Sequence, residues 1–285
     1  MADKANTHLL GLRGLLMEAR RAGDFGAAAA FAEEAASAAP ALAWAADAVI
    51  EARCADGDFA GARAVLERQM AQKGIDKTQY RRRRAVLLTA EAIALEHADP
   101  AVARERAVEA VRLAPTLVPA AACAGRLLGA AGELRKAAKI VETAFAANPH
   151  PELAEVDAHL RPGDAALDRL KRIKGLAAKA SGSPESAIAL ARAAIDAHDF
   201  RQARMVLEPL AEDPSQRVCL LRAELEAAEH GDIGKAREWT AKAVRANRDP
   251  AWMADGVVSD HWAPISPISG KLDAFVWAVP PGVSS

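Results

Sequence analysis

The densest charge in the sequence is a run of four arginines, Arg81, Arg82, Arg83 and Arg84, preceded by Tyr80. A guanidinium group binds phosphate or carboxylate through paired hydrogen bonds, so four of them over one helical turn suit a phosphate, a propionate or an acidic protein surface. An ordinary solvated helix face is the alternative interpretation. We predict that Arg81–Arg84 bind an acidic partner and not nucleic acid, because the run is short and the chain carries 37 basic against 38 acidic side chains.

Residues that could ligate a metal or a haem are few and scattered. The three cysteines form no Cys-x-x-Cys pair: Cys54, Cys123 and Cys219. Each lies among apolar helix-forming residues, which favours a buried small side chain over a disulfide, a zinc ligand or a haem ligand. Three histidines are expected at helix C-termini, where imidazole stabilises the helix dipole: His97, His198 and His230. His261, next to Trp262, is the least explained and is kept as a candidate ligand or partner contact.

The segment Ser266–Gly270, Ser-Pro-Ile-Ser-Gly, faintly resembles the second knuckle of a rubredoxin-like zinc ribbon, which reads Cys-Pro-x-Cys-Gly. Trp252 and Asp255 stand where the first two cysteines would be. Serine hydroxyls replace thiolates poorly as zinc ligands, so we predict no metal site. The sequence also offers no nucleophile with an assisting base and no phosphate loop, and we therefore predict no enzyme activity and no cofactor.

The composition of the chain indicates that helices position these candidate side chains. Alanine supplies 72 of the 285 residues, whereas aromatic residues supply 4% and tyrosine occurs once. Alanine is the strongest helix former, and the scarcity of bulky side chains excludes an all-β fold. Apolar residues make up 51% of the chain and the net charge is −1, as in a soluble globular protein. No segment offers the roughly 18 consecutive apolar residues that a membrane helix needs.

A pattern of a turn residue, an acid, three variable residues and an alanine occurs six times, with first residues 34, 41, 34, 66 and 33 positions apart. The first residue, usually glycine, allows the left-handed backbone that closes one helix, and the acid caps the next helix. The alanine lies one turn inside that second helix, where a small side chain allows close helix packing. The six repeat alanines are Ala28, Ala62, Ala103, Ala137, Ala203 and Ala236.

The period near 34 residues, the Gly-Asp turn, the alanine at a fixed offset and a terminal proline together resemble the tetratricopeptide repeat. We therefore expect an all-α, right-handed tetratricopeptide-like α-solenoid with a small C-terminal β-hairpin cap. The expected domains are an N-terminal subarray (1–148), an irregular linker with inserted helices (149–182), a C-terminal subarray (183–247) and a hairpin with tail (248–285). Four aromatic residues would pack as a cap on the last helix pair: Trp252, Trp262, Phe275 and Trp277.

Two stretches resemble the HemY-type proteins of proteobacterial haem biogenesis: Gly11–Ala19 running into Gly23-Asp24, and Trp262–Trp277 with its Trp-x-Pro and Leu-Asp-x-Phe-x-Trp elements. The resemblance covers nearly the whole chain. It implies a non-enzymatic scaffold of haem (protoheme) biogenesis that presents a helical-repeat surface to other proteins, namely haem-biogenesis enzymes at the inner membrane.

Members of that family carry two membrane helices before the repeat region, and this sequence has none. We therefore expect a chain that is soluble in this form and joins the cytoplasmic face of the inner membrane only through a missing N-terminal anchor. A direct carrier of haem or porphyrin is the alternative function, and a cryptic enzyme is the third. The sequence leaves the partner's identity and the oligomeric state open.

Overall fold

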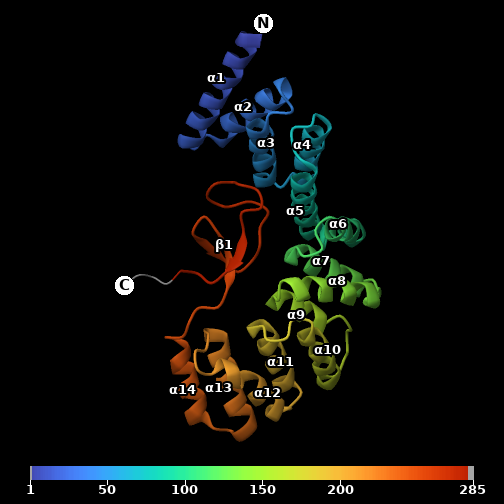
Figure 1. Cartoon of the computed structure of the whole chain (residues 1–285), viewed down its shortest axis with the longest axis vertical. Helices are drawn as coiled ribbons and strands as arrows, with labels where there is room; N and C mark the ends of the chain where they lie inside the picture. The colour runs from blue at the N-terminus through green and yellow to red at the C-terminus, as the bar shows by residue number, and fades with distance from the viewer. Residues whose placement is uncertain (1, 282–285) are drawn as a thin grey trace. The chain divides into compact units, whose positions relative to one another are not determined.

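The computed structural model describes residues 2–281 and consists mainly of helices (Figure 1). Within these residues, one compact unit comprises 2–114 together with 252–276 and is called unit 1. The other comprises 115–251 together with 277–281 and is called unit 2. The C-terminal tail is therefore shared between the two units, and 252–276 groups with the N-terminal helices.

In the described residues of unit 1, six helices follow one another, each in contact with the next. They are α1 (Ala2–Arg21), α2 (Phe25–Ala38), α3 (Ala43–Ala55), α4 (Phe59–Ala71), α5 (Lys77–Leu95) and α6 (Pro100–Leu113). Gly23 and Gly57 adopt left-handed backbone angles, with φ of 73° and 76°. These turns close α1 and α3 and start the second helix of each pair, as the repeat pattern predicts.

The acids of the repeat pattern cap the helices that follow them. In five of the six turns an aspartate side chain accepts a hydrogen bond from the backbone N–H three residues later: Asp24, Asp58, Asp99, Asp199 and Asp232. Glu133, the sixth acid, makes no such cap bond. The all-α repeat fold expected from the sequence is confirmed, with the turn geometry as its local cause.

Unit 2 continues the pattern of helix pairs over its described residues. Its helices are α7 (Val118–Ala130), α8 (Leu134–Ala147), α9 (Pro151–Ala158), α10 (Ala166–Ala178), α11 (Pro184–Asp196), α12 (Phe200–Leu207), the 3-10 turn η1 (Glu208–Leu210), α13 (Gln216–His230) and α14 (Ile233–Ala243). Helices α9 and α10, in the segment expected as a linker, pack against α7, α8 and α11. Gly163, with φ of 84°, precedes Asp164 and supplies another Gly-Asp turn between them.

Small residues let these helices approach closely. Five repeat alanines are buried: Ala28, Ala62, Ala103, Ala137 and Ala203. Ala236 in α14 is half-buried. Gly125 shows the same principle in α7, because a Cβ there would lie 2.7 Å from Val141 of α8 and 2.8 Å from Val156 of α9.

Three short strands form a small sheet with the order β2-β1-β3. They are β1 (Ala251–Ala254), β2 (Val257–Ser259) and β3 (Val276–Ala278). The first two pair antiparallel through a two-residue turn in which Asp255 and Gly256 have φ of 47° and 80°. Such a turn suits the right-handed twist of a hairpin, so the expected hairpin is present, with a third strand added beside β1.

The tail packs elsewhere than expected. Trp252 and Phe275 are buried within unit 1, whereas the last helix pair, α13 and α14, belongs to unit 2. Trp262 is half-buried, and Trp277 lies in unit 2 with its ring centroid 4.0 Å from that of His150. The expected packing of all four aromatic residues on the last helix pair is therefore wrong. Helix α14 buries only Ala243 completely, and its other residues are largely polar or small, which suits a terminal helix.

Candidate functional site

The arginine run lies on α5, and its members point in different directions because successive helical residues are about 100° apart. Arg82 donates two hydrogen bonds of 2.7 and 2.9 Å to Asp273 of the tail. Arg83 forms an ion pair of 2.6 Å with Asp47 of α3. Arg81 is exposed and makes no ion pair with any residue of the described range 2–281.

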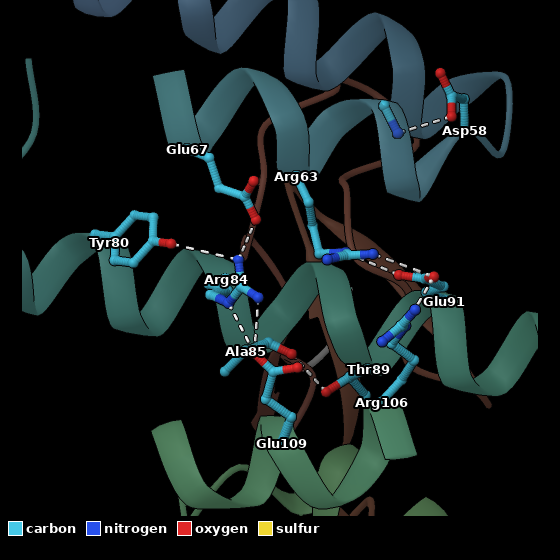
Figure 2. Close-up of polar contacts among 11 residues, drawn as sticks. Asp58, Arg63, Glu67, Tyr80, Arg84, Ala85, Thr89, Glu91, Arg106 and Glu109 are labelled. Carbon is cyan, nitrogen blue, oxygen red and sulfur yellow. Dashed lines mark hydrogen bonds and ion pairs between the residues drawn. The ribbon is translucent and has the colours of Figure 1, made fainter. Parts of the chain in front are cut away.

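Arg84 belongs to an ion-pair network that crosses three helices (Figure 2). It donates to Glu67 of α4 and, at 2.7 and 3.0 Å, to Glu109 of α6. Two helical turns further on, the charges are reversed: Glu91 of α5 accepts from Arg63 of α4 at 2.8 Å and from Arg106 of α6 at 3.1 Å. Three of the four arginines thus stabilise unit 1, and partner binding by Arg81–Arg84 stays a prediction.

The first helices of the repeats in unit 2, together with α10, line an open surface with two adjoining cavities of about 310 and 390 Å³. Both cavities include Glu155 of α9 and His159, which follows that helix. We call this surface the unit 2 groove. Its apolar lining includes Ala130, Ala154, Val156, Ala158, Leu160, Ile173, Ile188, Ala189, Leu220 and Leu221. Leu220 of α13 is half-exposed, at 46% of its possible area, so this large apolar side chain is available for contact.

The charges around the unit 2 groove balance one another. Its lining includes four arginines (Arg126, Arg169, Arg192 and Arg217) and four carboxylates (Glu152, Glu155, Glu185 and Asp196). Arg126 pairs with Glu152 at 3.0 Å, and Arg217 pairs with Glu185 at 2.7 Å. The groove therefore offers apolar area bounded by compensated charge, a composition typical of partner-binding surfaces.

Two buried titratable side chains support α9, the helix shared by both cavities. His150 caps its N-terminus by accepting from the N–H of Glu152 at 3.1 Å, and burial, followed by the charge of Arg217, lowers the pKa of His150 to about 4. Burial raises the pKa of Asp157 to about 7, against the attraction of Arg172. The Oδ2 atom of Asp157 has no hydrogen-bond partner among the residues that the structure describes.

The expected remnant of a zinc knuckle is held by hydrogen bonds. The Oδ2 atom of Asp255 accepts from the hydroxyls of Ser266 and Ser269, both at 2.5 Å, and these bonds lower the pKa of Asp255. Backbone N–H groups of Ile268 and Ser269 in turn donate to the Ser266 hydroxyl. The carboxylate thus joins the two serines directly.

The other candidate ligands do not come together. All three cysteines are buried, and burial raises the pKa of Cys54 to about 12, which keeps its thiol protonated. His198 closes α11 with φ of 56°, His230 ends α13, and His97 follows α5. The backbone carbonyl and N–H of exposed His261 bond to the Ser259 hydroxyl. Within residues 2–281, no group of three or more His, Cys, Asp or Glu side chains could hold a metal ion.

None of the helices in the described range combines the length and the apolar composition needed to cross a membrane. The sequence does not predict the unit 2 groove, because it places α9 and α10 in a linker with inserted helices (149–182). The Gly163-Asp164 pair was the available signal for this additional helix pair.

Capped helix pairs and ion pairs between successive repeats define a helical-repeat protein with tetratricopeptide-like pairs. No protein-family model matches the chain. It is 26% identical over 225 residues to the probable magnetosome protein Mms48 of Magnetospirillum gryphiswaldense, an alignment that covers 78% of this chain and 50% of that protein. The chain thus spans about half the length of this curated relative.

The comparison with solved structures finds two further similar proteins. One is a tetratricopeptide repeat protein from Parabacteroides merdae ATCC 43184, with 14% identity, a TM-score of 0.43, and coverage of 84% of this chain and 93% of that chain. The other is the TPR domain of P58(IPK), with 14% identity, a TM-score of 0.33, and coverage of 83% and 65%.

Proposed function

We propose that this chain is a non-enzymatic protein-binding scaffold and that the unit 2 groove holds a segment of its partner. The observation that carries the proposal is the pair of adjoining cavities that share Glu155 and His159. Helical-repeat proteins commonly use extended surfaces built from equivalent helices for binding. Here those helices are α7, α9, α11 and α13, with Arg169 and Ile173 of α10 completing the lining.

The chemistry of the groove specifies the kind of segment it would take. Because arginines and carboxylates balance, the partner segment is expected to insert apolar side chains between them rather than carry a large net charge. Binding should then depend weakly on salt. A partner held by Arg81–Arg84 would instead dissociate as salt rises, because exposed charges are screened.

A photo-crosslinking amino acid at position 220 tests the proposal. With the crosslinker at Leu220, irradiation of the chain with a bacterial lysate should join it to a defined protein. The matched control places the crosslinker at Met205 of α12, which is 64% exposed and does not line either cavity. The same adducts in equal yield from both positions would contradict the proposed site.

The finer proposal is that the partners are haem-biogenesis enzymes at the inner membrane. The tail supports it, because the Trp262–Trp277 elements resemble those of HemY-type proteins and are not required by a helical repeat. The relative Mms48 is named a probable magnetosome protein, so a magnetosome setting is the competing one. Identification of the Leu220 adduct by mass spectrometry separates the two: a haem-biosynthetic enzyme supports the first, and a magnetosome component the second.

A direct haem or porphyrin carrier is the second candidate function, and one observation favours it. His159 lines both cavities and its side chain is 61% exposed, so its imidazole is accessible to a ligand. Titration with haem would then give a Soret shift that saturates at one equivalent and is lost in His159→Ala. An unsaturable shift, or one unchanged by that substitution, would exclude the carrier.

A further inference from the structure

The face of unit 1 that corresponds to the unit 2 groove is covered by the chain's own tail. In unit 1 the first helices of the repeats are α1, α3 and α5, and ion pairs join them: Arg20 with Glu51 at 2.9 Å, and Asp47 with Arg83 at 2.6 Å. In unit 2 the equivalent ion pairs, such as Arg217 with Glu185, border open cavities. The two faces are therefore built in the same way and differ in what covers them.

Residues 270–275 are the segment that covers α3 and α5. Asp273 receives two hydrogen bonds from Arg82 of α5, and Gly270 lies against Glu51 of α3. Leu272 and Phe275 are both 7% exposed, so this short segment combines a partly exposed carboxylate–guanidinium pair with two buried apolar side chains. Such a combination is how a groove recognises a short peptide.

Two features make this contact suited to exchange. Asp273 has φ of 59°, a left-handed conformation that costs energy for a residue with a side chain. A cavity of about 460 Å³ remains beside the segment, lined in part by Thr78, Gln79 and Lys271. A peptide with the same side chains on a relaxed backbone would avoid this backbone cost, and it could fill the remaining space.

We propose that residues 270–275 are an intramolecular ligand of the α3–α5 face and that a partner segment with an apolar residue followed by aspartate displaces them. Arg82 would bind the partner's carboxylate as it now binds Asp273, and exposed Arg81 would add attraction for further acidic residues. The arginine run would thus bind an acidic peptide only after the tail has left. The inference rests on the proposed function in treating the first-helix faces as partner-binding surfaces.

The test uses the full chain and a fluorescent synthetic peptide with the sequence of residues 268–277, Ile-Ser-Gly-Lys-Leu-Asp-Ala-Phe-Val-Trp. Asp273→Asn weakens the bonds from Arg82 that hold residues 270–275 on the α3–α5 face. Fluorescence anisotropy should therefore show that this variant binds the peptide at least tenfold more tightly than the unaltered chain. Leu272→Ala should act in the same direction and serves as the second variant. The control Asp260→Asn alters an exposed carboxylate of the same tail and should leave the affinity unchanged.

Adding Arg82→Gln to Asp273→Asn should abolish the gain, because the peptide carboxylate then loses its guanidinium. Equal peptide affinity in the unaltered chain and in both tail variants would overturn the inference. A gain that persists without Arg82 would overturn it as well. The crosslink at Leu220 tests the unit 2 groove separately. A failed peptide test would therefore contradict only the inference about the α3–α5 face, and a failed crosslink would contradict only the proposed function of the unit 2 groove.

Discussion

Arg217 of α13 donates two hydrogen bonds, of 2.7 and 2.9 Å, to the carboxylate of Glu185 in α11, 32 residues earlier in the chain. A second pair joins the same helices with the opposite polarity, since Arg192 of α11 donates to Glu224 of α13 at the same offset of 32. Equal offsets mean that the two helices run parallel, one repeat apart. The pairs thus fix the register in which α11 and α13 line the unit 2 groove.

The first prediction concerns the repeat alanines. Ala137 is fully buried in α8, so Ala137→Leu should lower the free energy of unfolding by about 1 to 3 kcal/mol through overpacking. Ala146→Leu is the matched control, because Ala146 is exposed on the same helix and leucine is nearly as good a helix former. Urea unfolding of both variants measures the difference, and equal stability would refute the close packing at position 137.

The second prediction compares two ion pairs of different burial. Glu91 lies between Arg63 and Arg106 (Figure 2). Because only 12% of its side chain is exposed, Glu91→Ala should destabilise the protein by about 1 to 3 kcal/mol. Glu224→Ala breaks the pair with Arg192, in which both side chains are more than 40% exposed, and should cost about 0 to 1 kcal/mol. Thermal unfolding at low and high salt gives both values, and a larger loss at Glu224 would contradict the argument.

The third prediction concerns pH. The pKa of Asp157 rises from 3.8 to about 7 on folding, so the folded state holds its proton more tightly and stability falls as pH rises between these values. The pKa of His150 falls from 6.5 to about 4, so stability rises over nearly the same interval. The two effects oppose each other within unit 2.

Single substitutions should therefore expose opposite slopes. Relative to the unaltered chain, Asp157→Asn should become more stable as pH rises from 4 to 7, and His150→Asn should become less stable, each by an amount on the order of 3 kcal/mol. Asparagine keeps a capping oxygen at position 150 and a similar size at position 157. Urea unfolding across this pH range measures the slopes, and slopes of the same sign would show that at least one assignment is mistaken.

The fourth prediction concerns the bonds among Asp255, Ser266 and Ser269. Asp255→Ala removes the acceptor shared by the two hydroxyls, and Ser266 is buried, so backbone amides of residues 266–271 should exchange hydrogen faster. A chelator should leave both the exchange rates and the melting temperature of the intact protein unchanged, because the bonds need no metal. One equivalent of zinc in the purified chain would contradict this interpretation.

The repeat and its turns were predictable because they depend on neighbouring residues. Gly57 and Asp58, for example, close one helix and cap the next within three positions of sequence. The contact between Arg82 and Asp273 spans 191 positions and depends on where the tail packs, which no local pattern specifies. The four consecutive arginines resemble one surface patch in the sequence for a similar reason. Their side chains point in different directions, and two of them pair with carboxylates of neighbouring helices, namely Asp47, Glu67 and Glu109, which the sequence does not place next to α5.

The unit 2 groove was missed because its supporting turn departs from the repeat pattern. Position 168, five residues after Gly163, is aspartate rather than alanine, so the pattern failed there although the glycine turn is present. Helix α9 has eight residues, too few to show a clear apolar periodicity. Burial of Leu153 and Val156, and not sequence periodicity, identifies it as part of the packed array.

The central claim is that the unit 2 groove binds a partner protein. Its most direct test measures how much partner the immobilised chain captures after an acidic residue is introduced into the groove. Leu220→Glu places a charge among the apolar lining residues, while Met205→Glu makes the same change on an exposed apolar residue outside it. Both variants should melt at the temperature of the unaltered chain. We predict that Leu220→Glu captures at least tenfold less of the protein that crosslinks at position 220, at both low and high salt. Met205→Glu should capture as much of it as the unaltered chain. Equal retention of that protein by the two variants would contradict binding in the groove.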